Sequence, residues 1–267
     1  MNTYEDLTLE KLFRLDGEVA FVTGGGDGFG RIAAMTYANA GASVAVTDID
    51  KNKADTVVSE ITAGGGRALA LELDVSDRNA VKATIDEAVD AMGGLHILLN
   101  NAGITRRGPT VDMTDEDWHQ IIGINLHSFF YCTQTFIRHM VKNQWGRIIN
   151  ITGHASLRGS PFAAHTVAGK GGAVGFTRSI ATEFADQGIT CNNVAPGHMD
   201  TPPRRPYYTQ LKEEVGQEWY GGWISKIPMK KLGDPDEFGA LCAFLASEDA
   251  SYITGQMFLV NGGIMYS

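Results

Sequence analysis

The stretch GHASLRGSPFAAHTVAGK at residues 153–170 gathers several side chains that could move protons. His154 and His165 carry imidazoles, whose ordinary pKa near ~6.5 suits proton transfer at neutral pH. Thr166 and Lys170 are four residues apart, so on a helix they share one face. The pattern indicates a polar, acid–base site at the start of a helix.

The elements that must position this site follow from alternating apolar and amphipathic segments. Short apolar runs predict strands at residues 18–23, 43–47, 68–73, 97–100, 146–152, 190–194 and 257–260. Amphipathic segments predict helices over residues 30–40, 50–63, 78–92, 166–187 and 234–246, and one long helix or two over residues 114–143. Apolar strands separated by helices indicate an α/β fold with a doubly wound parallel sheet, covered by helices on both faces.

The chain shows no repeat, low-complexity tract or linker, which predicts a single domain over residues 17–267. Residues 1–16 read as a short N-terminal extension. Residues 202–231 break the strand–helix alternation, and we expect a loop-and-helix excursion there.

A glycine-rich segment, TGGGDGFG, follows the first strand and opens the first helix. Gly24, Gly28 and Gly30 permit a tight turn whose backbone N–H groups can approach a pyrophosphate, although glycine clusters also occur as plain turns. Asp48 follows Gly28 by twenty residues, where an acid accepts hydrogen bonds from a ribose and repels a 2′-phosphate. The pattern favours NAD over NADP. Asp27 could cap the helix, but its charge would repel a nearby pyrophosphate.

Composition excludes several other classes of function. The net charge of −9 argues against a nucleic-acid partner, because an acidic surface repels phosphate backbones. No apolar run is long enough to span a membrane, and the acidic start MNTYEDLTLEKLF lacks a signal core. Three scattered cysteines suit buried thiols rather than disulfides or a metal site. We therefore expect a cytoplasmic protein without a metal; the cysteines are Cys132, Cys191 and Cys242.

Further motifs line up with the glycine segment. They are Asp74-Val75 after the third strand, Asn100-Asn101-Ala102-Gly103 after the fourth, Asn125 in INL, and PGHMDT after the sixth. Taken together, the chain resembles the short-chain dehydrogenase/reductase family from about Leu15 to its end. The resemblance implies a Rossmann-type fold, an oxidoreductase and a nicotinamide dinucleotide.

The resemblance also implies a role for each matched position. Lys170 would bind the nicotinamide ribose, and Asn125 would anchor a water molecule of the proton relay. Asp48 would meet the adenosine ribose, while Met199 and Thr201 would meet the carboxamide. The implied cofactor-binding residues are Gly24, Asp27, Gly28, Phe29, Gly30, Asp48, Ile49, Asp74, Val75, Asn101, Ala102, Gly103, Lys170, Pro196, Gly197, Met199 and Thr201.

Two members of the family's catalytic set of Asn, Ser, Tyr and Lys are absent. Counting back four residues from Lys170 reaches Thr166, where the tyrosine is expected, and thirteen more reach Gly153, where the serine is expected. An aliphatic hydroxyl is far less acidic than a phenol, whose pKa is ~10. Loss of a general acid–base group costs roughly 10²–10⁴-fold in rate.

A neighbouring histidine could take over the tyrosine's task. His165 would need a shifted backbone, because adjacent positions on a helix point in different directions. His154 directly follows Gly153, at the other gap. Both histidines can equally be read as ordinary surface or loop residues. Thr166 could hydrogen-bond the substrate oxygen but would poorly exchange its proton.

Arginines and aromatic residues gather on the expected substrate side. Arginine forks suit carboxylates, and an arginine pair after NNAGI resembles family members that act on sugar acids. Aromatic faces suit sugar rings, yet these residues could also be solvated arginines and packing aromatics. They are Arg106, Arg107, Arg204, Arg205, Tyr207, Tyr208, Trp219, Tyr220 and Trp223.

Three functions follow from these observations. The preferred one is an NAD(H)-dependent oxidoreductase of a small hydroxyl or keto substrate, with a hint of a sugar acid or polyol and a non-standard proton relay. The alternatives are a non-redox lyase, isomerase or hydratase on the same scaffold, and a catalytically silent dinucleotide-binding protein. The resemblance implies a homodimer or homotetramer through the helices at residues 114–140 and 166–187.

Overall fold

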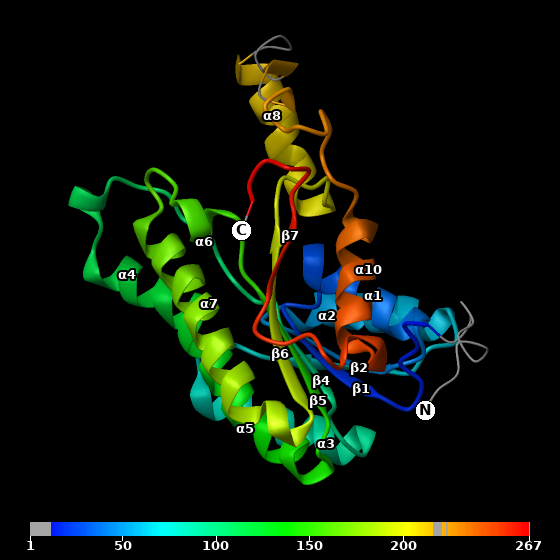
Figure 1. The fold of residues 1–267 in the computed structure, drawn as a ribbon. Helices are drawn as coiled ribbons and strands as arrows, with labels where there is room; N and C mark the ends of the chain where they lie inside the picture. Colours follow the sequence, from blue (N-terminus) through cyan, green and yellow to red (C-terminus); the bar gives the residue numbers. More distant parts are fainter. Residues whose placement is uncertain (1–11, 216–220, 223, 267) are drawn as a thin grey trace.

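The computed structural model describes residues 12–215, 221–222 and 224–266. Its centre is a seven-stranded parallel sheet in the order β3-β2-β1-β4-β5-β6-β7 (Figure 1). The order reverses between β1 and β4, which creates the switch point where such sheets bind ligands. The strands are β1 (Val19–Thr23), β2 (Ser43–Asp48), β3 (Ala68–Glu72), β4 (Ile97–Asn100), β5 (Gly146–Ile151), β6 (Ile189–Pro196) and β7 (Met257–Val260).

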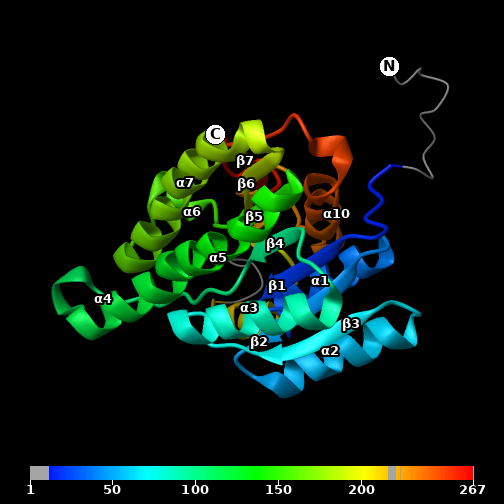
Figure 2. The same ribbon diagram turned by 90° about the horizontal axis from the view of Figure 1, so that it is seen from below.

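Helices cover both faces of the sheet, as Figures 1 and 2 show. Alternate β1 residues explain this arrangement: Ala20 and Val22 point into one buried cluster, and Val19 and Phe21 into the other. The first cluster packs against α1 (Gly28–Asn39), α2 (Lys51–Ala63) and α10 (Pro235–Ala246). The second packs against α3 (Arg78–Met92), α5 (Ser128–Asn143) and α7 (Ala164–Phe184). The predicted doubly wound α/β fold is confirmed.

Local sequence signals set several helix ends differently from the predicted bounds. The helix α1 starts at Gly28, because the extended Asp27 caps it. Residues 114–143, predicted as one long helix or two, form two helices, α4 (Asp115–Ile122) and α5, joined by a π-helical turn at Gly123–His127. The helix α7 begins at Ala164, so His165 and Thr166 both lie in its first turn.

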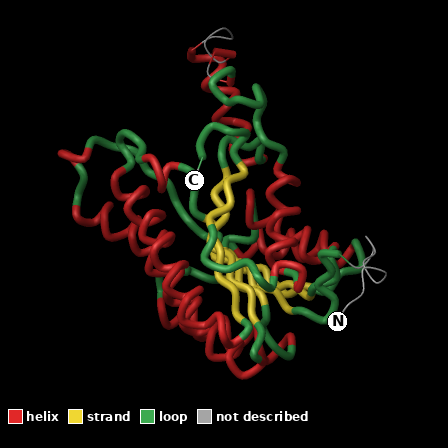
Figure 3. Tube along the Cα trace, viewed as in Figure 1, coloured by secondary structure: helices red, strands yellow, loops and turns green. Residues whose placement is uncertain are grey.

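Two predicted segments are described in part. Within the N-terminal extension, Leu15 is buried, and the Phe13 amide donates to the Asp249 carboxylate at 2.7 Å. Residues 202–231 contain a 3-10 turn (Pro202–Arg204) and α8 (Arg205–Val215). Figure 3 shows α8 standing beyond the ends of the strands. Trp219, Tyr220 and Trp223, like residues 1–11, lie outside the described residues.

Two general expectations can be compared with the structure. Cys132, Cys191 and Cys242 are all buried and free, as their apolar surroundings predicted. In the part of the chain that is described, no helix is long and apolar enough to cross a membrane.

Candidate functional site

The predicted site residues converge at one edge of the sheet. Parallel strands end on the same side, so the segments after Thr23, Asn100, Ile151 and Pro196 meet where the strand order reverses. Lys170 lies on α7 and reaches the end of β5, where the Lys170 Nζ donates to the Ile151 carbonyl oxygen at 2.7 Å.

The glycine segment forms a tight backbone cradle before α1. Gly24 and Gly28 have positive φ of 61° and 53°, which favours glycine at both positions. A Cβ built on Gly30 would lie 2.0 Å from the Gly24 carbonyl oxygen, so no larger residue fits there. The Asn101 side-chain amide donates to the carbonyls of Thr23 and Gly24 at 2.9 and 3.0 Å. The cradle therefore fits a pyrophosphate at the helix N-terminus.

The charge of Asp27 is partly compensated in the fold. One carboxylate oxygen accepts from the Gly28 amide at 2.8 Å, and the other lies 3.2 Å from Lys53 Nζ. The neighbouring Phe29 packs its ring on Phe238, with centroids 4.7 Å apart. The repulsion expected between Asp27 and a pyrophosphate is reduced by this ion pair.

Asp48, predicted to meet the adenosine ribose, lies beside the glycine cradle. Its carboxylate accepts hydrogen bonds from the Gly26 and Asp50 amides, both at 3.0 Å. Ile49 is exposed at the next position. A ribose diol could approach the half-buried Asp48 carboxylate here.

The segment after β3 forms a second part of the adenosine side. The Asp74 carboxylate accepts from the Ser76 amide and hydroxyl at 2.9 and 2.7 Å. Val75 is buried in the core cluster beneath this turn. Asp74 thus shapes the turn, while Val75 anchors it.

Lys170 and Asn125 meet over the segment after β4. A Cβ built on Gly103 would lie 2.9 Å from both Asn125 Oδ1 and Lys170 Nζ. The fully buried Asn125 side chain donates to the Ile104 carbonyl at 2.8 Å and accepts from its amide at 3.0 Å. The π-helical turn that carries Asn125 is a distortion frequent at functional sites. This close packing leaves no room at position 103 for a residue larger than glycine.

The environment of Lys170 weakens its hold on a proton. Its amino group points inward, 5.0 Å from the centre of the Phe129 ring, although part of the residue stays exposed. Burial lowers the pKa of Lys170 to about 8. An amine with this pKa can give or take a proton near neutral pH.

The two positions without the expected serine and tyrosine differ in what surrounds them. The Thr166 hydroxyl is buried and has no hydrogen-bond partner among the described residues. Such groups are rare in native structures, because burial without a partner costs free energy. A Cβ built on Gly153 would meet nothing within 4 Å. Gly153 therefore adjoins open space, whereas the Thr166 hydroxyl is enclosed and its hydrogen bonding is unsatisfied.

Both candidate histidines make local contacts. His165 is only 3% exposed, and its Nδ1 accepts from the Thr166 amide at 2.9 Å, which requires an unprotonated nitrogen. His154 Nδ1 lies 3.4 Å from the Pro196 carbonyl oxygen, and its Nε2 lies 3.3 Å from Arg158 Nη2. Burial lowers the pKa of His154. These contacts hold both imidazole rings in place.

The segment after β6 is tightly fixed. The Gly197 amide donates to the Val260 carbonyl at 2.9 Å, and a Cβ on Gly197 would lie 2.7 Å from the Asn261 Cα. Met199 and Thr201 are 1% and 2% exposed. Main-chain atoms of this segment are therefore the groups that could contact a carboxamide.

Sequence reasoning missed two residues of the site, His198 and Arg158. His198 was passed over inside the PGHMDT motif, although its type alone was a signal. Its ring lies 5.4 Å from that of His154. Arg158 ends the short helix α6 (Ala155–Arg158), and nothing in the sequence showed that it would reach His154.

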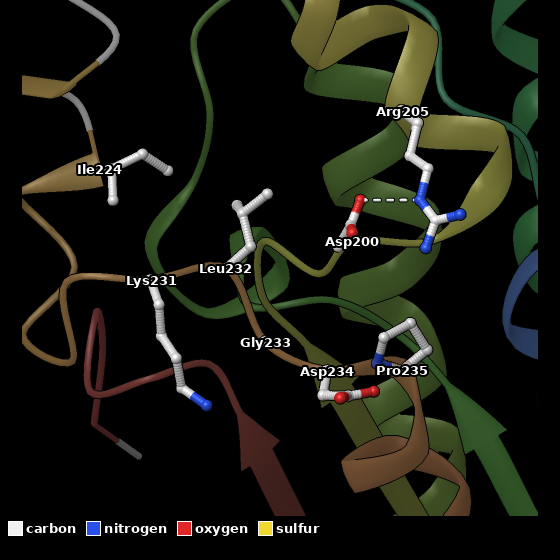
Figure 4. A pocket seen from close by; sticks show the side chains of 8 residues that line it. All are labelled: Asp200, Arg205, Ile224, Lys231, Leu232, Gly233, Asp234 and Pro235. Carbon is white, nitrogen blue, oxygen red and sulfur yellow. Dashed lines mark hydrogen bonds and ion pairs between the residues drawn. The ribbon is translucent and has the colours of Figure 1, made fainter.

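A cavity of about 530 Å³ lies beside this edge, between the start of α8 and the segment leading into α10 (Figure 4). An ion pair joins Asp200 and Arg205 at 3.1 Å on one side of it. None of the predicted catalytic residues lines it. Its lining residues are Asp200, Arg205, Ile224, Lys231, Leu232, Gly233, Asp234 and Pro235.

Known proteins resemble this chain over nearly its whole length. A family model described as enoyl-(acyl carrier protein) reductase matches residues 24–265. The 3-oxoacyl-[acyl-carrier-protein] reductase FabG of Thermotoga maritima is 34% identical over 252 residues, covering 94% of this chain and 99% of its own. The (2S)-[(R)-hydroxy(phenyl)methyl]succinyl-CoA dehydrogenase subunit BbsD of Thauera aromatica is 37% identical, covering 93% and 97%.

Solved structures agree with these relatives. A Sinorhizobium meliloti protein provisionally assigned as a short-chain alcohol dehydrogenase superimposes with a TM-score of 0.88 at 35% identity, covering 95% of this chain and 98% of that one. The matched segment includes both the glycine cradle and the Lys170 helix. The chain therefore belongs to the short-chain dehydrogenase/reductase family and is an oxidoreductase of that type.

Proposed function

We propose that this protein interconverts a hydroxyl and a keto group on a small molecule with NAD(H), and that Lys170 carries the proton. The observation that carries the proposal is the meeting of Lys170 Nζ and the Asn125 amide on Gly103, beside an intact glycine cradle. A bound nicotinamide dinucleotide would supply or accept the hydride. The glycine cradle would hold its pyrophosphate, and Lys170 would contact its ribose.

Charge around the adenosine side supports NAD over NADP. The carboxylates of Asp27, Asp48 and Asp50 all raise the pKa of Lys53, and the Asp27 hydrogen bond has the largest effect. Three carboxylates thus gather about one ammonium group. A 2′-phosphate would add negative charge to a region that is already acidic, whereas a ribose hydroxyl could donate to Asp48.

The catalytic roles follow from the groups that the site offers. The unpartnered Thr166 hydroxyl would hydrogen-bond the substrate oxygen, since this would satisfy a buried polar atom. Lys170, whose pKa is about 8, would take the proton from a substrate hydroxyl or return it to a keto oxygen. The space at Gly153 would admit a substrate group or a water molecule in place of the serine hydroxyl. His165 and His154 would orient neighbouring groups rather than carry the proton.

Family membership and the intact cofactor side do not favour the non-redox and silent alternatives. A homodimer or homotetramer through α5 and α7, a cytoplasmic location, and a sugar acid or polyol as substrate stay predictions.

A fluorescence titration with NADH, with NADPH as the comparison, tests the proposal. We expect NADH to bind more tightly than NADPH. In the Asp48→Asn variant, the difference between the affinities for NADH and NADPH should become smaller. Asp55→Asn is the matched control, because Asp55 pairs with Lys51 on the exposed face of α2. Failure to bind either dinucleotide would overturn the redox function; equal binding of both would overturn only the NAD assignment.

A further inference from the structure

A pair of imidazoles lies on the substrate side of the site, next to the open position at Gly153. The rings of His154 and His198 stand edge to face, with centroids 5.4 Å apart. Arg158 can only donate, so its contact with His154 Nε2 leaves the ring proton on Nδ1, facing the Pro196 carbonyl. His154 is therefore held by hydrogen bonds to α6 and to the end of β6, and its ring contacts that of His198; we call the two residues the histidine pair.

Two more arginines approach the histidine pair from other segments. The Gly108 amide donates to the Phe162 carbonyl at 2.8 Å, which ties the Arg107 segment to the loop after α6. The Arg204 amide donates to the Thr201 carbonyl at 2.9 Å, which holds Arg204 in the 3-10 turn after β6. These backbone bonds fix the segments that carry Arg107 and Arg204, and the charges of both arginines act on His198.

Burial and nearby positive charges both lower the pKa of His198. Burial is the largest cause that lowers the pKa of His198 to about 4. His154, Arg204, Arg158 and Arg107 lower it further through their positive charge. In the part of the chain that is described, every charged group that shifts this pKa is cationic or becomes cationic on protonation.

The arginines next to Arg107 and Arg204 in sequence are paired with carboxylates. Arg106 pairs with Asp117, and Arg205 pairs with Asp200. Within the described residues, no carboxylate forms an ion pair with Arg107, Arg158 or Arg204, which we call the arginine cluster. Arg107, Arg158 and Arg204 are exposed, so water weakens their mutual repulsion, but an anion bound among them would accept charge-assisted hydrogen bonds from their guanidinium groups.

We propose that the arginine cluster and the histidine pair form a subsite for the carboxylate or phosphate group of an anionic substrate. The subsite adjoins the catalytic groups, because His154 follows Gly153 and Arg204 lies three residues after Thr201 in sequence. A substrate anchored there by its acid group would present its hydroxyl or keto carbon to Thr166 and Lys170. This last step rests on the proposed function, whereas anion binding does not.

The test measures anion binding directly, without turnover. Histidine ring protons of the full-length protein are followed by NMR while four probes are added: D-gluconate, its uncharged counterpart sorbitol, glycerol 3-phosphate, and its uncharged counterpart glycerol. His154→Gln and His198→Gln variants assign the two rings. A bound anion should raise the pKa of His198 by at least one unit, because it offsets the surrounding positive charge.

The variants identify the groups responsible. Arg158→Gln combined with Arg204→Gln should weaken anion binding at least tenfold, and Arg107→Gln should weaken it less. Arg106→Gln is the matched control and should bind as the unaltered protein does, since Arg106 is already paired with Asp117. Circular dichroism verifies that each variant is folded.

Each outcome decides the proposal. Binding of gluconate alone assigns a carboxylate substrate, binding of glycerol 3-phosphate alone assigns a phosphate, and binding of both assigns the shared anionic chemistry. Equal response to charged and uncharged probes, or binding that the arginine variants leave unchanged, overturns the subsite. NADH titration of the same variants should be unaltered, so failure of the cofactor site is distinguished from failure of the anion subsite.

Discussion

At the scale of single residues, Thr166 bears most directly on how this enzyme works. Its hydroxyl is buried without a partner among the described residues, and such a group destabilises a fold by about 1–3 kcal/mol. Thr166 stands where the family has its tyrosine. A bound ligand that completes the hydrogen bonding of Thr166 would explain why a destabilising group is kept there.

Replacement of Thr166 by valine separates these effects, because valine keeps the shape and removes the hydroxyl. We expect Thr166→Val to raise the free energy of unfolding by about 1 kcal/mol or more, measured in urea. Turnover by the same variant should fall at least tenfold. An unaltered turnover would contradict the role of the hydroxyl in binding the substrate oxygen.

Lys170 leads to a prediction about pH. Its pKa is about 8, so the amine is mostly protonated below this pH and mostly neutral above it. Oxidation of a hydroxyl needs the neutral form and should accelerate as the pH rises through 8, while reduction of a keto group should slow. Initial rates of NADH formation and consumption between pH 6 and 10 would measure this.

The Lys170→Met variant should lose both the inflection and most of the activity. Lys82→Met is a matched control, because Lys82 forms an exposed i,i+4 pair with Asp86 on α3. If Lys170→Met kept an inflection near pH 8, another group would carry the proton.

At the scale of elements, the sequence allowed the sheet and its helical layers to be predicted, because apolar runs and helical periodicity extend over whole elements. The π-helical turn at Gly123–His127 could not be predicted, since one extra residue in a turn requires no particular residue type. The predicted start of α1 at residue 30 is wrong, because Asp27 caps the helix and lets it begin at Gly28.

The candidate site shows the same limit. The glycines, Asp48, Asn125 and Lys170 could be identified from motifs whose spacing is fixed by strand and helix ends. The contact of Arg158 with His154 could not, because α6 has only four residues and carries no periodic pattern. Contacts between side chains of separate loops leave no mark on local sequence.

The glycine cradle gives a prediction at this scale. Gly30→Ala should reduce NADH affinity at least a hundredfold, because the added methyl would lie 2.0 Å from the Gly24 carbonyl oxygen and force the loop open. Gly175→Ala in α7 is the control: its Cβ would meet nothing within 4 Å, so stability should stay the same or rise by up to ~1 kcal/mol. Tight NADH binding by Gly30→Ala would show that the cradle does not hold the cofactor.

At the scale of the whole molecule, the candidate site and a buried arginine that joins several segments lie at opposite ends of β5. Arg147 is the second residue of β5, toward the opposite end of that strand from Ile151, whose carbonyl accepts from Lys170. The Arg147 side chain is only 1% exposed and lies 4.3 Å from the Trp145 ring. It donates to the carbonyls of Ser247, Gly146 and Gly188 and to the Glu248 carboxylate.

This one side chain ties β5 to the end of α10 and to the turn before β6. Arg147→Met should keep the packing on Trp145 but leave buried carbonyls without donors, which predicts a loss of about 2–4 kcal/mol in the free energy of unfolding. Arg14→Met is the comparison, because its ion pair with Asp16 is exposed and screened by water, so its loss should leave the free energy of unfolding nearly unchanged. Urea unfolding would give both values.

Because the affected contacts lie at the edge opposite the cofactor cradle, NADH affinity of folded Arg147→Met should equal that of the unaltered protein. A loss of affinity without a loss of stability would mean that the two ends of the sheet are coupled.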